Sequence, residues 1–368
     1  MITSLQIKNY RNLKNLKLDS LDQINLITGK NNTGKTSLLE AVAIYANQGS
    51  LNLLSDLMRS HGEYFREMEV NTAQVTSMNI SALSSLFYDR VVGFEAENAI
   101  TIGEGESSLV TIKFVKYGEK VEQDTAGTSM MNRRFMIDDL NEDNLDEYKT
   151  GLYITSAEKK QLISMERSFF SIRTIGGSTN AVNLEFLKTG YIDLNNNDIL
   201  FDKIALTDKE QYVIEALKII EPDTERIAFV SKGSRERFAV IKLSKQDDIL
   251  PLKSMGDGIN RILSIILALV NCENGFLLID EFENGLHYTV QEQLWKIIFK
   301  LAKQLNIQVF ITTHSEDCIS SFEQVLNDSR KKIGGKLIRL DNINGVIKQT
   351  EFSPKELKIA NEQDIELR

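Results

Sequence analysis

Alternating apolar and polar positions open the chain and then give way to a helical spacing. Residues 2–7 and 13–18 follow the period of two that is typical of half-buried strands, and residues 24–27 form a short apolar run. The pattern therefore predicts strands, then a glycine-rich turn at residues 29–36, then a helix. The apolar face of that helix is predicted to comprise Leu38, Leu39, Val42, Ala43 and Ala46.

A second group of apolar segments lies in the last third of the chain. Residues 275–279 and 309–313 have the composition of buried strands, and residues 259–267 have the apolar spacing of a helix. Residues 157–222 are expected to be mostly helical. We expect an α/β fold with a mostly parallel core sheet, to which the N-terminal residues add antiparallel strands. The three expected parts are residues 1–125, a mainly helical insertion at 126–225, and residues 226–368.

Composition and charge narrow the class of protein. The chain has 368 residues, 42% of them hydrophobic and 26% charged, as in an ordinary globular protein. Its net charge of −9 argues against a surface coated for nucleic-acid binding. The longest mostly apolar run, residues 262–270, is too short to cross a bilayer, and the first residues show no signal-peptide pattern. Cys272 and Cys318 give no disulfide framework, so we expect a cytoplasmic protein without membrane contact.

The turn at Gly29–Thr36 carries the strongest chemical signal. It matches G-x-x-x-x-G-K-[ST] between a predicted strand and a predicted helix, the context that a phosphate loop requires. Backbone N–H groups of such a loop hold phosphate oxygens, the lysine reaches the β- and γ-phosphates, and the threonine hydroxyl binds Mg²⁺. We therefore predict a site for ATP and Mg²⁺, with Lys35 as a catalytic residue and Thr36 as a metal ligand. The expected nucleotide-binding residues of the loop are Asn31, Asn32, Thr33, Gly34, Lys35, Thr36 and Ser37.

An acidic pair, Asp280 and Glu281, follows the predicted strand at residues 275–279. Both carboxylates should emerge at the carboxyl edge of the sheet, where ligands bind in open α/β folds. We predict that Asp280 positions Mg²⁺ and that the catalytic Glu281 polarises the attacking water. The alternative is that the pair only stabilises a helix N-terminus.

The segment Ser254–Gly258 precedes the predicted helix at residues 259–267. Ser254 suits an N-cap, and the glycines leave backbone N–H groups open to an anion. The segment resembles the signature motif of ABC-type ATPases, in which serine and glycine contact the γ-phosphate held by the other subunit. It lacks the glutamine of the transporter form, which favours the SMC-like and RecF-like branch. The resemblance implies that Ser254 and Gly256 bind ATP across a dimer of heads.

Three further segments are similar to the same group of ATPases. His314, at the end of the strand at 309–313, resembles the switch histidine that reads the γ-phosphate and is expected to be catalytic. Glu283–His287 resembles the loop that crosses the dimer interface in RecF-like and OLD-like proteins. Asn9–Asn12 resembles the N-terminal Asn-aromatic-Arg motif, which implies that Arg11 approaches the nucleotide.

The resemblance is specific over residues 1–48 and 250–320 and implies an ABC-type P-loop ATPase head. On that basis the parts at 1–125 and 226–368 are the two halves of the head; the first holds the phosphate loop, and the second holds the signature, the Walker B acidic pair and the switch histidine. The magnesium-binding glutamine of the family is not assigned, because Gln48 and Gln161 are candidates by location alone.

The leading hypothesis is an SMC-like enzyme that hydrolyses ATP, pairs head to head around it and resembles the ATPase subunits of OLD-like and PARIS-like anti-phage systems. Such ATPases act with an effector, often a Toprim nuclease. Few residues follow His314, so we expect the effector, such as a Toprim nuclease or a toxin, to be a separate chain.

The alternative is a RecF-like DNA-repair or recombination ATPase that binds DNA directly. A basic cluster made of Arg330, Lys331, Lys332, Lys336 and Arg339 would support it, although an ordinary solvated surface also explains the cluster. A transporter subunit is disfavoured by the signature segment and by the Arg11 motif.

Overall fold

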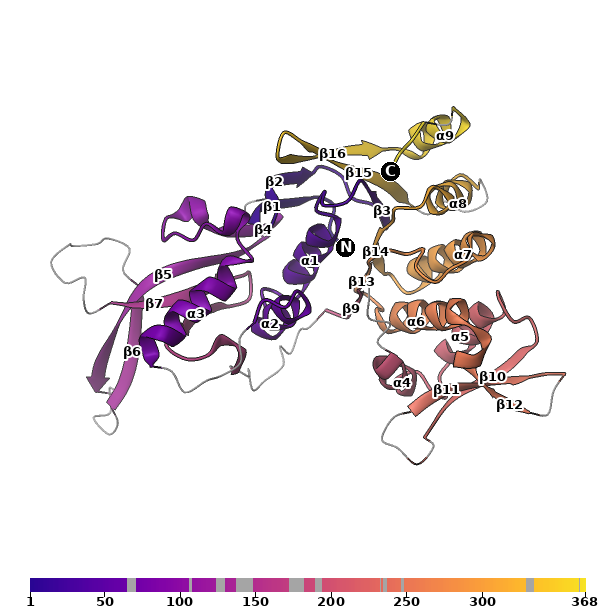
Figure 1. Cartoon of the computed structure of the whole chain (residues 1–368), viewed down its shortest axis with the longest axis horizontal. Coiled ribbons are helices and arrows are strands. Elements are labelled where there is room, and N and C mark those ends of the chain that lie inside the picture. The colour runs from indigo at the N-terminus through magenta and orange to yellow at the C-terminus, as the bar shows by residue number, and fades with distance from the viewer. Residues whose placement is uncertain are drawn as a thin grey trace. The chain divides into compact units, whose positions relative to one another are not determined.

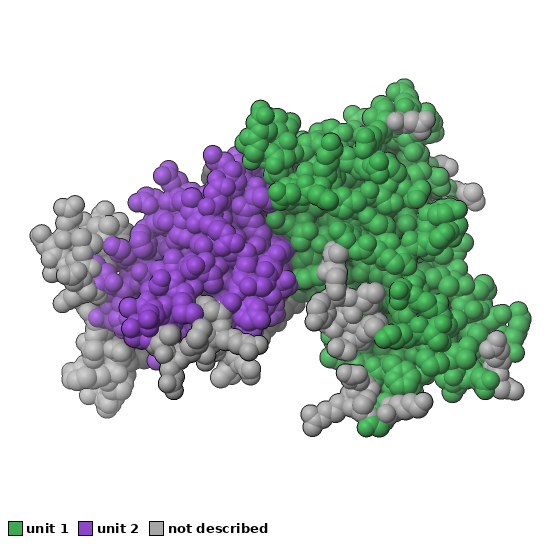
Figure 2. Space-filling view, in the orientation of Figure 1, with its two compact units in different colours: residues 1–3, 19–39, 182–368 green, residues 4–18, 40–181 purple. Residues whose placement is uncertain are grey.

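In the computed structural model of the chain, the described residues are 1–64, 71–105, 108–123, 130–136, 148–171, 182–188, 194–231, 233, 237–245, 248–328, 334–363 and 365–368. They divide into two compact units (Figure 2). Unit 1 comprises residues 1–3, 19–39 and 182–368, and unit 2 comprises residues 4–18 and 40–181. Among the described helices, none is both long enough and apolar enough to cross a membrane.

A six-stranded sheet forms the centre of unit 1, in the order β16-β15-β3-β14-β13-β9 (Figure 1). The pairs from β15 to β9 are parallel, and β16 is added antiparallel at one edge. This arrangement confirms the mostly parallel core sheet. Its strands are β3 (Ile24–Thr28), β9 (Leu184–Leu187), β13 (Phe276–Ile279), β14 (Gln308–Thr312), β15 (Gly335–Ile343) and β16 (Val346–Phe352).

The central strands place the predicted site segments at one edge of the core sheet. All residues of β3, β13 and β14 are buried, as is typical of parallel strands covered on both faces. Each of the three strands ends where a predicted site segment starts: the phosphate loop, the acidic pair and the residues before His314. Since β3, β14 and β13 are neighbours, their carboxyl ends bring these segments to one edge of the sheet.

Helices pack along one side of this sheet. In Figure 1, α6, α7 and α8 stand in a row beside the strands, and α9 follows α8. Twelve of the fifteen residues of α6 are buried, which makes α6 the central helix of the unit 1 core. The helices are α4 (Leu194–Asp202), α5 (Lys209–Leu217), α6 (Asp257–Asn271), α7 (Tyr288–Gln304), α8 (Glu316–Leu326) and α9 (Pro354–Glu362).

Unit 1 also contains a small antiparallel sheet that packs on α4 and α5. Its strands are β10 (Thr224–Ser231), β11 (Arg237–Leu243) and β12 (Ile249–Pro251). The chain passes from β12 through a short 3-10 turn, Leu252–Met255, into α6. This sheet therefore leads directly into the predicted signature segment.

Unit 2 is built on a seven-stranded sheet with the path β2-β1-β4-β5-β7-β8, and β6 pairs with β5. Its pairs are antiparallel, and α2 (Leu51–Ser60) and α3 (Thr72–Ser84) belong to the same unit. The helix after the phosphate loop, α1 (Lys35–Ala46), starts in unit 1. The strands are β1 (Leu5–Tyr10), β2 (Leu13–Leu18), β4 (Ile100–Glu104), β5 (Ser108–Gln123), β6 (Met130–Met136), β7 (Lys149–Thr155) and β8 (Lys160–Ser164).

Two expectations need correction. The antiparallel strands predicted at the N-terminus exist as β1 and β2, but they belong to the unit 2 sheet and not to the core sheet that contains β3. The mainly helical insertion at 126–225 is wrong for the described residues, because β6, β7, β8 and β9 lie there besides α4 and α5. Short apolar runs such as β9 fit either a strand or a helix, and pairing with β13 decides. The boundaries at 125 and 225 stay a prediction.

Candidate active site

The phosphate loop lies between β3 and α1, as predicted. Gly29 has a φ of +136°, and a Cβ at this position would lie 2.3 Å from the carbonyl oxygen of Leu340, so only glycine fits here. Asn31 and Asn32 are exposed, whereas Thr33 and Gly34 are buried. The loop therefore presents its middle residues to solvent, where a phosphate group can reach their backbone.

The Lys35 side chain turns back over its own loop. Its Nζ donates hydrogen bonds to the carbonyl oxygens of Gly29 (2.7 Å) and Lys30 (2.9 Å). Burial lowers the pKa of Lys35 to about 8, although the charges of Asp280 and Glu281 act in the opposite direction. The ammonium group is thus held by two backbone carbonyls of its own loop.

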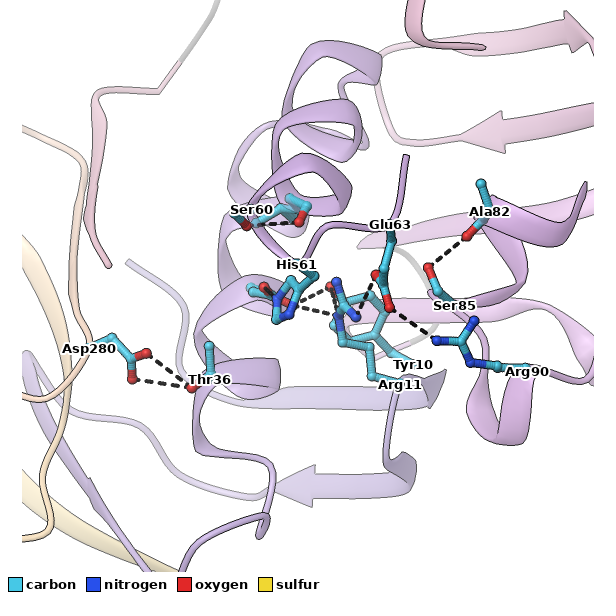
Figure 3. Close-up of polar contacts among 12 residues, drawn as sticks. Tyr10, Arg11, Thr36, Ser60, His61, Glu63, Ala82, Ser85, Arg90 and Asp280 are labelled. Carbon is cyan, nitrogen blue, oxygen red and sulfur yellow. Dashed lines mark hydrogen bonds and ion pairs between the residues drawn. The ribbon is translucent and has the colours of Figure 1, made fainter. Parts of the chain in front are cut away.

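Thr36 and Asp280 meet as the metal prediction requires. The Thr36 hydroxyl lies 3.1 and 3.3 Å from the two carboxylate oxygens of Asp280 (Figure 3). Adjacent ligands of an octahedral Mg²⁺ ion are separated by about 3 Å, and hydroxyl and carboxylate oxygens are the donors that the ion prefers. These two residues therefore fit a magnesium ion that is completed by phosphate oxygens and water. Ser37, the next residue of α1, is half-buried.

Thr312, the last residue of β14, holds both members of the acidic pair. Its hydroxyl donates to Asp280 Oδ1 (2.6 Å) and accepts the backbone N–H of Glu281 (2.8 Å). Glu281 adopts a φ of +49°, a conformation that is strained for a residue with a side chain. Asn284 Nδ2 donates to Glu281 Oε2 (2.7 Å). The strained backbone and these two contacts fix the direction of the Glu281 carboxylate.

His314 is placed by a second carboxylate. Glu283 accepts the backbone N–H of His314 (2.7 Å) and the hydroxyl of Thr313 (2.7 Å) through its two oxygens. Glu281 and His314 line one cavity of about 650 Å³ together with residues 29–31 of the phosphate loop. The structure thus brings together the phosphate loop, the acidic pair and the histidine, which come from three separate parts of the sequence.

Arg261 is a member of this cluster that the sequence did not identify as a site residue. It lies on α6, is 3% exposed, and its Nη2 donates to the carbonyl oxygens of Asp280 (3.2 Å) and Glu281 (3.1 Å). Burial lowers the pKa of Arg261, against the charges of Asp280, Glu283 and Glu281. An arginine inside an apolar helical run was the available signal, since a buried charge needs polar partners. Arg261 therefore ties α6 to the end of β13.

Ser254 and Gly256 are not among the residues that line this cavity, and both are exposed. The N-cap prediction for Ser254 is wrong: its hydroxyl donates to the Pro251 carbonyl (2.7 Å), and Gly256 occupies the N-cap position of α6. Gly256 has a φ of +100°, and a Cβ there would meet no atom within 4 Å. The start of α6 thus presents an open backbone surface.

The loop 283–287 packs beside this start. A Cβ on Gly258 would lie 3.2 Å from the carbonyl oxygen of Gly285. The two segments that the resemblance assigns to a dimer interface, 254–258 and 283–287, are therefore neighbours in unit 1. Whether either one contacts a second copy stays a prediction.

Arg11 belongs to a polar network within unit 2. Its guanidinium pairs with Glu40 (2.7 Å) and with Glu63 (3.1 Å), and Figure 3 shows Glu63 between Arg11 and Arg90. His61 Nε2 lies 2.6 Å from Glu40. These contacts give Arg11 a structural role in unit 2, and its approach to a nucleotide stays a prediction.

The acid at the centre of this network is unusual because it is buried and ionised. Glu40 is 1% exposed, and Tyr10 donates a hydrogen bond to it (2.9 Å). Burial alone would raise the pKa of Glu40, but the hydrogen bond of His61 and the charge of Arg11 bring it below the usual value. The magnesium-binding glutamine of the family stays unassigned. Gln48 donates to the Tyr45 carbonyl and Gln161 lies in β8, so neither is identified as that glutamine.

Comparison with known proteins agrees with this geometry. The family model described as AAA ATPase domain matches residues 1–226 and 179–319 of the chain. The chain is 25% identical over 347 residues to a protein of Helicobacter pylori named ATP/GTP phosphatase, covering 89% of each chain. It is 23% identical over 352 residues to the DNA replication and repair protein RecF of Rickettsia typhi, covering 87% of this chain and 96% of that protein.

The fold has a solved counterpart. An Smc head, crystallised bound to the C-winged helix domain of ScpA, superimposes with a TM-score of 0.50 at 12% identity, over 96% of this chain and 98% of that one. At this identity the likeness concerns the fold alone. With the family match over the phosphate loop, the acidic pair and the histidine, the chain belongs to the AAA ATPase domain family and has the α/β fold of an SMC head.

Proposed function

We propose that the protein binds ATP with Mg²⁺ at the edge of the core sheet and hydrolyses the bond to its terminal phosphate. One observation carries the proposal: Lys35, Thr36, Asp280, Glu281 and His314 converge on one edge of the sheet although they come from three separate parts of the chain. A mere helix-capping role for the acidic pair does not explain why Asp280 contacts the phosphate-loop threonine.

The residues divide the chemistry between them. Lys35 exchanges its two carbonyl partners for the β- and γ-phosphate oxygens. Thr36 and Asp280 hold Mg²⁺, which when bound neutralises charge on the phosphates. Glu281, directed by Thr312 and Asn284, orients and deprotonates the attacking water.

His314 lines the same cavity as Glu281. Its proposed role is to sense whether the terminal phosphate is present. Glu283 holds the histidine backbone, so loss of the phosphate at one end of the cavity is transmitted to the loop 283–287. That loop packs beside Gly258 at the start of α6. The state of the nucleotide is thereby linked to the surface where Ser254 and Gly256 lie.

We also infer that two copies pair around ATP. Ser254 and Gly256 lie at the exposed start of α6 and do not line the nucleotide cavity of the same copy, and there is open space around Gly256. This placement supports contact with the nucleotide of a second copy. The pairing would control a separate effector, and the resemblance to OLD-like and PARIS-like ATPases supports a role in anti-phage defence. Isolation of the protein with its genomic neighbour, with and without ATP, tests for that effector.

A second candidate is a RecF-like ATPase that binds DNA directly, favoured by the similarity to RecF along most of the chain. The predicted basic cluster gives this candidate less support. Residues 330–332 of the predicted basic cluster lie outside the described residues, Lys336 pairs with Glu351 (2.8 Å), and Arg339 pairs with Asp341 (2.9 Å). Turnover that rises with added duplex DNA, and falls back with salt, would favour this candidate.

The proposed ATPase is tested first at Lys35. Lys35→Ala removes the charge-assisted contact to the terminal phosphates, so binding of a fluorescent ATP analogue should be lost. Lys296→Ala is the matched control, because Lys296 is an exposed lysine on α7 that pairs with Glu292 of the same helix. Equal nucleotide affinity in Lys35→Ala and the parent would contradict the proposed site.

A further inference from the structure

Residues 365–368, which follow α9, lie beside the phosphate loop. Thr28, the last residue of β3, donates its hydroxyl to the carbonyl oxygen of Leu367 (2.7 Å). Thr28 is completely buried and Leu367 is 2% exposed. Because Gly29 follows Thr28 directly, this hydrogen bond places residues 366–368 at the point where the phosphate loop starts.

Packing inside unit 1 holds this segment in position. Leu357, Ala360 and Leu367 all belong to the main apolar core of the unit. Glu323 on α8 accepts hydrogen bonds from Asn361 (3.1 Å) and Asn327 (2.7 Å), so α9 is fixed to α8. The residues that flank Leu367 therefore have their direction set by the fold.

Glu366 and Arg368 line the same cavity as Glu281 and His314. Carboxylates gather around this cavity, since Glu283 lines it as well. A triphosphate that enters such a cavity meets several negative charges and needs cations to compensate them. Arg368 is one of the cationic side chains available there.

The present partners of Arg368 are easily exchanged. Its Nε lies 3.0 Å from Glu366 and 3.3 Å from Glu316 at the start of α8. All three side chains are about half exposed or more, and ion pairs of this kind contribute little to stability. A guanidinium presents a planar fork of donors that matches a phosphate group, which makes phosphate the stronger partner.

We propose that Arg368 is a nucleotide-binding residue that contacts the terminal phosphate of ATP, leaving Glu316 and Glu366 when the nucleotide enters the cavity. The proposal rests on the proposed ATP site. It names the terminal phosphate because Glu281 and His314 also line this cavity, and the proposed function gives them the activation of the attacking water and the recognition of that phosphate. The chain therefore distinguishes ATP from ADP in part through the segment after α9.

The test compares the affinities of a non-hydrolysable ATP analogue and of ADP, both with Mg²⁺, by calorimetric titration. Arg368→Ala should weaken binding of the analogue about tenfold, the scale of one charge-assisted hydrogen bond, and change ADP binding by less than about twofold. Arg368→Lys keeps the charge without the fork of donors. Its affinity for the analogue should lie between those of the parent and of Arg368→Ala. Lys358→Ala, which removes an exposed cation of α9 that lies in another ion pair, should change neither affinity.

A second pair of variants separates contact from folding. Glu316→Gln removes a competing partner of Arg368 and should strengthen binding of the analogue, and the gain should vanish in the double variant with Arg368→Ala. Equal losses for ADP and the analogue in Arg368→Ala, or a gain from Glu316→Gln that persists in the double variant, would overturn the role of Arg368. If the parent protein binds neither nucleotide, the proposed ATP site fails and this inference fails with it.

Discussion

At the scale of single residues, the sequence identified those side chains whose chemistry depends on a local pattern. The phosphate loop, Asp280 and Glu281 were predicted because each follows a recognisable strand, and the structure brings them together. Thr312 has no local signature, and the one local signal of Arg261, a charge inside an apolar helical run, does not reveal its partners. Their importance comes from partners that are distant in the sequence.

Ser254 shows the opposite error. Serine before an apolar helix is a strong N-cap signal, yet the 3-10 turn Leu252–Met255 gives its hydroxyl the Pro251 carbonyl as a partner. The chain then turns at Gly256, which has a φ of +100° and is the N-cap of α6. The helix therefore starts two residues later than an N-cap at Ser254 would imply. A competing local hydrogen bond was the deciding factor, and sequence alone gives no measure of it.

A prediction at this scale concerns the buried acid Glu40. Its folded pKa is below the ordinary value of 4.5, so the stability it contributes is fully present above that pH and is lost as the pH falls through the folded pKa. Tyr10, Arg11 and His61 are the groups that face it. Glu40→Gln should therefore lower the melting temperature at pH 7, and the difference from the parent should shrink in acid.

Calorimetry at a series of pH values checks this. Fluorescence of Trp295, the single tryptophan, reports unit 1 and serves as the internal control, because Glu40 lies in unit 2. A difference in melting temperature between Glu40→Gln and the parent that stays constant from neutral pH into acid would show that the Glu40 charge is not the stabilising group.

At the scale of elements, the buried strands of the core sheet were the most predictable part of the fold. β3, β13 and β14 are short apolar runs bounded by polar residues, and each was expected within about two residues of its observed bounds. The helical prediction for residues 157–222 is wrong at β8 and β9, because nothing in a four- or five-residue run reveals the strand with which it will pair. Strand identity there is decided by the neighbour and not by the run itself.

The link between α6 and β13 gives a prediction of its own. Arg261→Met keeps much of the side-chain volume but removes the donors to the carbonyls of Asp280 and Glu281. Leaving those carbonyls without this donor should cost about 1–3 kcal/mol. The unfolding of unit 1 by urea, followed through Trp295, should shift to lower urea, and ATP turnover should fall because the strained Glu281 is no longer held.

Arg261→Lys is the matched variant, since it keeps the positive charge and loses the planar fork. Partial recovery of stability and turnover is expected. Unchanged turnover in Arg261→Met, despite a measurable loss of stability, would show that Arg261 supports the fold of unit 1 without directing Glu281.

At the scale of the whole molecule, the division of the chain was the least predictable feature. Residues 4–18 lie next to β3 in the sequence, yet they form a sheet with β4 and β5 in unit 2. Each unit is assembled from segments that are far apart along the chain. Local sequence patterns predict contiguous parts, whereas these interleaved units depend on strand pairing between distant segments.

The proposed pairing of two copies belongs to this scale. Ligand binding that occurs only in the dimer stabilises the dimer by mass action, so ATP should drive association when hydrolysis is blocked by Glu281→Gln. Adding Gly256→Glu should abolish that association by repelling the γ-phosphate of the other copy, while ATP binding to one copy survives. Light scattering with and without ATP measures the assembly.

Gly345→Glu is the matched control, because Gly345 also has a positive φ (+84°) with no atom within 4 Å of a Cβ, but lies in the turn between β15 and β16. Gly345→Glu also places a glutamate at a positive φ, and this protein should still pair with ATP. Full ATP-dependent association of the Gly256→Glu protein would remove the support for a signature surface.

The measurement that tests the central claim most directly is ATP hydrolysis by Glu281→Gln, with nucleotide affinity determined on the same preparation. Glutamine fills the space of Glu281 but cannot accept the proton of the attacking water. The account predicts that ATP binds as tightly as to the parent, while turnover falls about a hundredfold or more, the scale of lost general-base assistance. Glu292→Gln on the exposed face of α7 should leave both quantities unchanged. Equal turnover in Glu281→Gln and the parent would contradict the account.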